Sequence, residues 1–236
     1  MSGLVDSVKQ NVLGHIFSGK FPPGSNLREA RLAKDFGVSQ ATVRAVLQSL
    51  ESDGLVTREP NVGTTVIRLT PKDIRERVEL RRMLEVTAAL EASKHMGPAE
   101  FDELERRRTK MGSFVEKDLY YEEAQADLDF HRYVWQCSEN QMLCNLLERL
   151  TVPLLAFVSV LRASGLEHLS EVVPSHEPMV DALRSGDPAQ IEAAFSEGAQ
   201  STYLDFIETR GSKVQQAVAF GWLSSPFPKD DALPLR

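Results

Sequence analysis

One aspartate and two histidines have the types and spacing that suggest metal chemistry. Asp127 and His131 stand four residues apart in a stretch of helical periodicity, so both fall on one inward face, one turn apart. His176 lies on the apolar stripe of another predicted helix and can face the same interior. A carboxylate and two imidazoles suit Zn²⁺ and similar divalent ions. A buried Asp–His hydrogen bond beside an unrelated histidine fits the same spacing.

A second set of polar residues has the pattern of a DNA-reading helix. Apolar residues recur at helical spacing over 39–50, and the preceding helix stops at Gly37, where a tight turn is favourable. Two short helices joined in this way predict a helix-turn-helix, whose second helix can enter a major groove. An ordinary helical hairpin fits the spacing as well. The candidate DNA contacts at the start of the second helix are Ser39 (also a good N-cap), Gln40, Thr42 and Arg44.

Two β-strands follow, over 55–58 and 64–69, with a turn between them. Three helices and a small hairpin predict a winged helix-turn-helix. Asn61 and Gly63 at the turn are candidates for approaching the minor groove, although Gly63 also suits a turn that needs a positive φ. Arg28, which opens the first helix of the motif, is a candidate phosphate contact or a solvated surface charge.

The rest of the chain reads as helices that must position the Asp–His residues. Thr70 and Pro71 form a strong helix start after a short linker. The predicted fold class is therefore mainly α, with an N-terminal winged helix-turn-helix (1–69), an all-helical antiparallel bundle (73–212) and a tail (213–236) that is either disordered or docked on a neighbouring subunit. The helices are predicted near 71–94, 98–111, 116–137, 140–163, 171–185 and 188–210.

Composition indicates a soluble protein of the cytoplasm. The 236 residues are 42% hydrophobic and 26% charged, which is typical of globular proteins. No stretch is expected to provide the ~18 apolar residues of a membrane span, and the N-terminus lacks a signal-peptide pattern. The two cysteines, Cys137 and Cys144, are expected to be buried thiols in a reducing compartment.

Charge is distributed unevenly between the two predicted domains. The whole chain carries −7, but residues 1–68 hold eight Lys/Arg and six Asp/Glu, while residues 69–236 hold nineteen and twenty-eight. The first domain is therefore basic by two charges and the second acidic by nine, which indicates different partners. Because the first domain is only mildly basic, we expect two copies, a homodimer, on one double-stranded DNA operator.

Residues 10–68 resemble the GntR family of bacterial transcription regulators. Three positions depart from its pattern: Gln40 replaces a common basic residue, Ala30 replaces an arginine of the FadR branch, and Thr42 replaces a frequent proline. Gln pairs well with adenine, which allows a different operator. The resemblance is carried by residues 16–27, Leu32-Ala33, Gly37-Val38-Ser39, Val43-Arg44, Leu47, Leu50, Gly54-Leu55-Val56 and Gly63.

Residues 73–210 resemble the FCD ligand-sensing domain of the FadR branch. The resemblance is carried by residues 81–85, 127–131, 138–140, His176 and 182–187. It implies a divalent metal, held by one Asp and three His, that helps to bind a small carboxylate effector. Asp127, His131 and His176 match the first three ligands, and the fourth position falls at Gly198.

The glycine at the fourth position leaves two alternatives open. Three ligands can still hold Zn²⁺ or a similar ion, with water or effector completing the shell. Otherwise the site has no metal, and the space beside Gly198 admits a larger effector. Arg81 is expected either to bind the effector carboxylate or to form an ion pair with Glu85.

These patterns together predict a transcription regulator rather than an enzyme. An effector, an organic or sugar acid, would shift the bundle between two arrangements and so change operator affinity, with repression as the expected mode. One alternative is a metal-dependent hydrolase built on the bundle, although no nucleophile or general base stands out. Another is an architectural DNA binder without a ligand, which the inward Asp and His residues disfavour.

Overall fold

The computed structural model describes residues 2–59, 63–117, 119–161, 176–200 and 203. The described chain forms two compact units that meet in sequence between Arg68 and Leu69. The first unit contains α1 (Ser2–Phe17), α2 (Glu29–Phe36), α3 (Gln40–Ser52), β1 (Val56–Glu59) and β2 (Gly63–Val66). The second contains α4 (Pro71–Ala92), α5 (Pro98–Val115), α6 (Tyr120–Cys137), α7 (Gln141–Leu161), α9 (Glu177–Ser185) and α10 (Pro188–Gln200). Asn61 and the tail 213–236 lie outside the described residues.

The turn between α2 and α3 has the predicted chemistry. Gly37 adopts a left-handed conformation (φ +63°), and its N–H bonds to the carbonyls of the last turn of α2. Ser39 caps α3 by accepting the N–H of Thr42 at 3.1 Å. The inward residues of α3 then pack against α1 and α2, which fixes the outer face of α3. These buried residues are Val43, Val46, Leu47 and Leu50.

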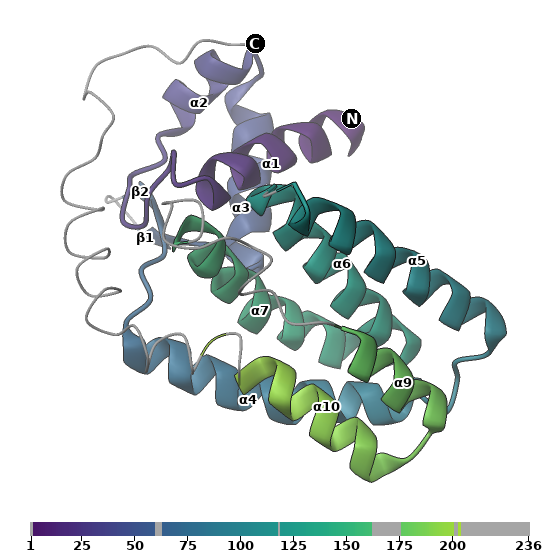
Figure 1. Cartoon of the computed structure of the whole chain (residues 1–236). Coiled ribbons are helices and arrows are strands. Elements are labelled where there is room, and N and C mark those ends of the chain that lie inside the picture. The colour runs from purple at the N-terminus through teal and green to yellow at the C-terminus, as the bar shows by residue number, and fades with distance from the viewer. Residues whose placement is uncertain (1, 60–62, 118, 162–175, 201–202, 204–236) are drawn as a thin grey trace. The chain divides into compact units, whose positions relative to one another are not determined.

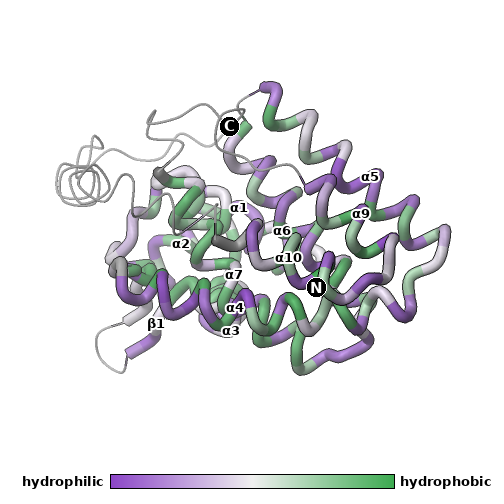
Figure 2. Tube along the Cα trace, turned by 60° about the horizontal axis from the view of Figure 1, so that its bottom comes forward, coloured by the Kyte–Doolittle hydropathy of each residue, from purple (hydrophilic) through white to green (hydrophobic). Residues whose placement is uncertain are grey.

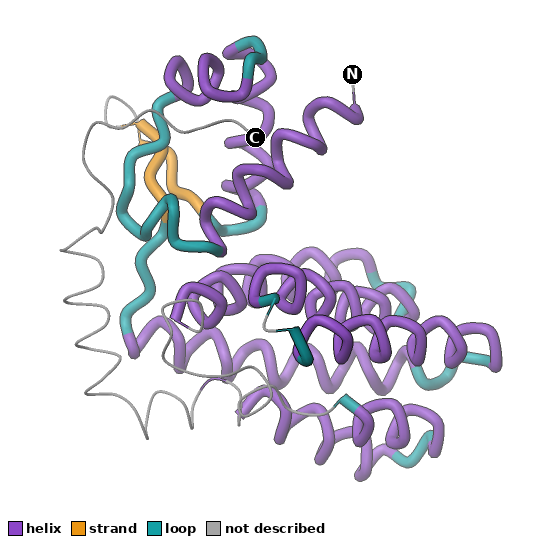
Figure 3. The backbone as a smooth tube through the Cα atoms, turned by 45° about the horizontal axis from the view of Figure 1, so that its top comes forward, coloured by secondary structure: helices purple, strands orange, loops and turns teal. Residues whose placement is uncertain are grey.

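The wing is a two-stranded antiparallel hairpin with a third segment beside it. Val56 pairs with Val66, and Glu59 pairs with Gly63. Asn26 bridges to Thr65, and the N–H of Leu27 donates to the carbonyl of Thr64 at 2.8 Å. Figure 3 shows the strands of the described chain confined to this hairpin. The hairpin is therefore held to the segment that enters α2.

The second unit is a helical bundle. A capping box between Thr70 and Asp73, with Pro71 in the first turn, begins α4. α4 packs against α6, α7 and α10, and α5 packs along α6 (Figure 1). Figure 2 shows hydrophilic and hydrophobic residues mixed along α5, as expected for an amphipathic helix. The shared core includes Ala89, Leu104, Phe130, Val134, Leu183, Ile191 and Phe195.

Three helix boundaries differ from the sequence prediction. α5 continues to Val115, so α6 starts at Tyr120 rather than at residue 116. His176 is the N-cap of α9 rather than a residue inside a helix over 171–185. Pro178 explains this, because proline suits the first turn of a helix and disfavours its interior. The last predicted helix is described up to Gln200.

α7 corrects the expectation that no segment has the length and hydrophobicity of a membrane span. Gln141–Val160 has a window of mean hydropathy 1.5, which meets both criteria. Within the bundle, 67% of that window is buried. Every residue from Thr151 to Val160 is buried, so α7 is apolar because protein surrounds it.

Candidate functional site

Asp127, His131 and His176 converge in the bundle. The stripe predicted for α6 faces inward, which places Asp127 and His131 one turn apart among buried residues. His176 enters from the start of α9. Its Nε2 lies 3.0 Å from Oδ1 of Asp127 and 3.3 Å from Nε2 of His131. His176 is therefore part of the same cluster, so the alternative of an unrelated histidine is wrong.

The spacing of these atoms fits a small divalent ion. Nε2 of His131 lies 3.9 Å from Oδ1 of Asp127, which completes a triangle with edges of 3.0, 3.3 and 3.9 Å. Tetrahedral Zn²⁺ with bonds of about 2.0–2.1 Å requires ligand–ligand distances of about 3.3–3.4 Å. Within the described residues, these three side chains are the group whose ligand atoms approach closely enough to share an ion.

Glu85 on α4 fixes one face of the cluster. Its Oε1 lies 2.6 Å from Nδ1 of His131 and accepts the indole N–H of Trp135 at 3.1 Å. A carboxylate at Nδ1 favours the tautomer with its proton there, which leaves the Nε2 lone pair for the cluster interior. Glu85 and His131 are both buried. α4 therefore supplies the group that orients a ligand carried by α6.

Arg81 forms the ion pair with Glu85 that the sequence left as one alternative. Its Nε donates to Oε2 of Glu85 at 3.0 Å, and its Nη1 donates to the hydroxyl of Tyr203 at 2.9 Å. All three residues are buried. Burial alone would raise the pKa of Glu85, but the charges of Arg81 and His131 lower it to about 2. In this structure Arg81 is therefore engaged by groups of the protein itself.

The net charge buried in the cluster depends on whether the two imidazoles are protonated. Burial alone would raise the pKa of Asp127, but the hydrogen bond with His176 and the charges of the two histidines hold it below its usual range. Protonated imidazoles would offset the two carboxylates, whereas neutral imidazoles, the form that binds a metal, leave Arg81, Glu85 and Asp127 with one net negative charge. An uncompensated buried charge is unfavourable. The chemistry of the donor set therefore agrees with its geometry in fitting a divalent cation.

Gly198 lies on α10 next to Met179 of α9. A Cβ added at Gly198 would come within 2.2 Å of the terminal methyl of Met179. Met179 is buried, so this methyl already occupies the space beside the glycine. The expected room for a larger effector beside Gly198 is therefore filled in this structure. The occupant is the end of a flexible side chain, which moves more easily than backbone.

The first unit presents most of its candidate DNA contacts to solvent. The residues that form this surface are on α3 and at its N-cap, at the start of α2 and at the start of β2. Thr42 is half-buried, and its hydroxyl lies 2.9 Å from that of Ser39. Asn61 falls outside the described residues. The exposed candidates are Arg28, Ser39, Gln40, Arg44 and Gly63.

Arg44 has a partner that sequence reasoning did not find. Its Nε and Nη2 donate to the carboxylate of Glu29, with a shortest distance of 2.7 Å. This pair lowers the pKa of Glu29 and raises that of Arg44, mainly through the hydrogen bonds themselves. Residues fifteen apart on two helices give no local signal of such a contact.

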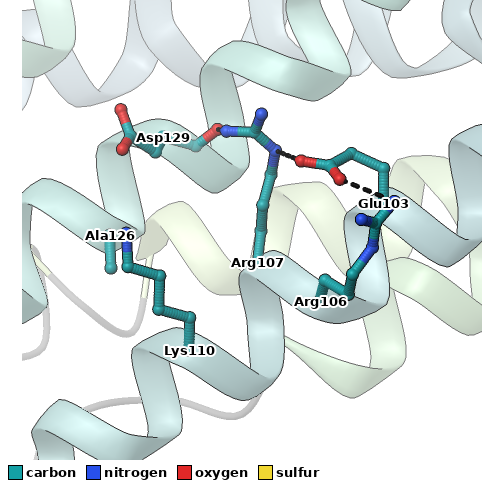
Figure 4. Close-up of a pocket in the computed structure, with 6 residues that line it drawn as sticks. All are labelled: Glu103, Arg106, Arg107, Lys110, Ala126 and Asp129. Carbon is teal, nitrogen blue, oxygen red and sulfur yellow. Dashed lines mark hydrogen bonds and ion pairs between the residues drawn. The ribbon is translucent and has the colours of Figure 1, made fainter.

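A separate shallow pocket of about 190 Å³ lies between α5 and α6 (Figure 4). Glu103 forms ion pairs there with Arg106 and Arg107, each at 2.9 Å. Arg107 also donates to the carbonyl of Asp129 at 3.3 Å. Glu103, Arg106 and Arg107 of this pocket are thus engaged with one another. None of the site residues expected from sequence lines this pocket.

Sequence reasoning also missed Trp135 and Tyr203 as members of the buried network. Trp135 lies one turn beyond His131 on α6, so helical spacing could have indicated it. Tyr203 comes from a distant part of the chain, and nothing in its surrounding sequence pointed to Arg81.

A winged helix-turn-helix followed by a helical bundle with a buried ligand-type cluster defines a class of protein: DNA-binding transcription regulators that carry their own sensor domain. Residues 4–66 match the family described as bacterial regulatory proteins, gntR family, and residues 76–199 match the FCD domain. The chain belongs to the GntR family and carries an FCD domain. It is a DNA-binding transcription regulator and not an enzyme, and the comparisons give no support to the hydrolase alternative.

Individual relatives agree with this assignment. The chain is 31% identical over 194 residues to a protein of Paenarthrobacter nicotinovorans named "Probable D-xylose utilization operon transcriptional repressor", covering 82% of this chain and 84% of the other. It is 26% identical over 180 residues to the gluconate operon transcriptional repressor of Bacillus licheniformis, covering 73% and 72%. The fold resembles that of E. coli McbR/YncC, with a TM-score of 0.73, 20% identity and coverage of 91% and 98%.

Proposed function

We propose that this regulator is a repressor whose operator affinity changes when its bundle binds a small organic or sugar acid. The observation that carries the proposal is the buried cluster of Asp127, His131 and His176 in a unit joined directly to a winged helix-turn-helix. Relatives named for D-xylose and gluconate operons support repression and a sugar-derived effector. An effector that prefers one arrangement of the bundle shifts the population toward it.

Asp127, His131 and His176 would hold a divalent metal, Zn²⁺ or a similar ion. A bound ion supplies positive charge and an open coordination position for the carboxylate of an effector. The protein's own contribution is to orient His131 through Glu85 and to keep water away by burial. Met179 would move to admit an effector beside Gly198. Arg81 would reach an effector only by exchanging Tyr203 or Glu85 for it.

On the DNA side, a homodimer would bind a palindromic operator in the cytoplasm. The start of α3 would enter the major groove with Gln40, Thr42 and Arg44, while Ser39 would lie near a phosphate. Arg28 would contact the backbone, and Asn61 and Gly63 would approach the minor groove at the wing. The proposed division is 1–69 for DNA binding and 73–212 for the sensor, followed by the tail 213–236.

Operator binding with and without candidate acids tests the proposal. An operator is first selected from a random duplex library with the purified protein, and its affinity is then measured with metal-loaded protein and a panel of sugar acids. One acid should change the affinity at least tenfold and be recovered unchanged. Chemical conversion of the acid would contradict the assignment as a sensor. Indifference to every acid and every metal would favour the architectural DNA binder.

A further inference from the structure

The ion pair between Glu29 and Arg44 joins the two helices of the helix-turn-helix. Nε of Arg44 lies 3.2 and 3.1 Å from the two carboxylate oxygens of Glu29, and Nη2 lies 2.7 Å from Oε2. The carboxylate therefore binds the side edge of the guanidinium, which is formed by Nε–H and one hydrogen of Nη2. The end edge, formed by Nη1 and the second hydrogen of Nη2, keeps its parallel donors. This is the fork geometry that can bind O6 and N7 of guanine.

The surroundings of Glu29 favour a fixed position for the carboxylate. Its side chain is 24% exposed, whereas that of Arg44 is 54% exposed. Arg58 of β1 lies 3.8 Å from Oε1 of Glu29 and 3.8 Å from Glu51 of α3. The carboxylate thus contacts both Arg44 and Arg58, and the Arg44 guanidinium is more exposed to solvent than the carboxylate that holds it. A flexible side chain that is held in place loses less entropy when it binds.

Arg44 is the one basic residue in α3, whose sequence is QATVRAVLQSLES. Any recognition of a guanine by a charged fork from this helix depends on it. We propose that Glu29 is a positioning residue that determines operator specificity, because it holds Arg44 with its end edge ready for a base. This inference rests on the proposed contact between Arg44 and DNA.

Affinity measurements distinguish a positioning role of Glu29 from simple repulsion of DNA by its carboxylate. Removing a repelling carboxylate would strengthen binding to operator and to unrelated DNA alike. Removing a positioning carboxylate releases Arg44, so the ratio of operator affinity to scrambled-duplex affinity must fall. One well-oriented bidentate contact contributes strongly to discrimination between bases, and we expect its partial loss to lower the ratio about tenfold.

The experiment compares four single variants and one double variant on a selected operator and a scrambled duplex. Glu29→Gln should lower the ratio about tenfold, with binding to scrambled DNA unchanged or stronger. Glu29→Asp keeps the charge but shortens the side chain, so it should also lower the ratio. If the Gln variant does not fold, the ratio of the Asp variant tests the positioning role of Glu29. The control Asp35→Asn removes a charge from the same helix, where Asp35 pairs with Arg31, and should leave the ratio unchanged.

The variant Arg44→Ala tests the DNA contact proposed for Arg44 separately from the positioning role proposed for Glu29. If operator binding survives in this variant, the DNA interface proposed for α3 is wrong, and the role of Glu29 is wrong with it. If Arg44→Ala loses operator binding while folded Glu29→Gln and Glu29→Asp keep the full ratio, only the positioning role is overturned. Adding Glu29→Gln to Arg44→Ala should produce no further loss of discrimination.

Discussion

Glu85 and His131 lie on different helices, and Oε1 of the one is 2.6 Å from Nδ1 of the other. The same oxygen accepts the indole N–H of Trp135, and the second oxygen accepts from Arg81. A single buried carboxylate thus joins α4 to the ligand-bearing face of α6. Nε2 of His131 is therefore oriented by the fold itself, which would prepare the proposed metal site before an ion binds.

The first prediction concerns metal content. Purified protein should contain about one divalent ion per chain, and His131→Ala should lose it, because two remaining ligands rarely hold an ion. The exposed His95 offers a matched control, since His95→Ala should keep the metal. Elemental analysis of the three proteins provides the measurement. Equal metal content in all three would remove the cluster as the site.

The second prediction concerns the orientation of His131. Glu85→Gln should weaken metal binding about 10- to 100-fold while retaining stoichiometry, as is usual when the partner of a ligating histidine is lost. Calorimetric titration with Zn²⁺ after chelation measures this. Glu91→Gln, on the exposed side of the same helix, is the control. An unchanged affinity in Glu85→Gln would show that the contact only packs the bundle.

The third prediction concerns the pair Gly198 and Met179. Gly198→Ala replaces a glycine inside a helix, which by itself favours folding by about 1 kcal/mol. The new methyl group would collide with the Met179 methyl, so the gain should appear only after Met179→Ala makes room. Urea unfolding of the two single variants and the double variant measures the coupling. Additive free energies would mean that the two side chains do not meet.

The fourth prediction concerns pH. Glu85 has a folded-state pKa of about 2, below its ordinary value of 4.5, and the pKa of Asp127 is also depressed. Each carboxylate therefore contributes stability that is complete above its unfolded-state pKa and is lost as the pH falls toward the folded-state value. Metal-free protein should lose unfolding free energy between about pH 4.5 and pH 2. Glu85→Gln should show a shallower loss; equal slopes would contradict this origin.

The fifth prediction concerns Arg28. As a phosphate contact, it contributes charge but no base recognition, so Arg28→Ala should weaken operator and scrambled DNA by similar factors. The slope of log affinity against log salt should fall by about one per site. Anisotropy titrations at several salt concentrations give both quantities. A loss confined to the operator would instead make Arg28 a base-reading residue.

Local patterns predicted most of the fold. The Gly37 turn, the Ser39 cap and the Thr70–Asp73 start are short-range features, and the structure contains all three. The helical stripe of α6 likewise predicted the inward Asp127 and His131. Contacts between distant segments could not be read this way. Glu29 with Arg44 and Arg81 with Tyr203 depend on how helices pack, which single-sequence spacing does not encode.

The connection between the two units is short. Ile67 is still tied to the first unit, since its N–H donates to the carbonyl of Leu55 at 2.9 Å, and α4 starts at Pro71. Arg68 and Leu69 lie between Ile67 and Thr70, and Thr70 is already bound to Asp73 in the cap of α4. Two residues span at most about 7 Å, so the linker to this helix of 22 residues is short. That helix also carries Arg81 and Glu85. In the proposed homodimer, the short linker would therefore act as a tether that keeps each DNA-binding unit close to the start of its own α4, and this limits the operator half-site spacings that the dimer could reach.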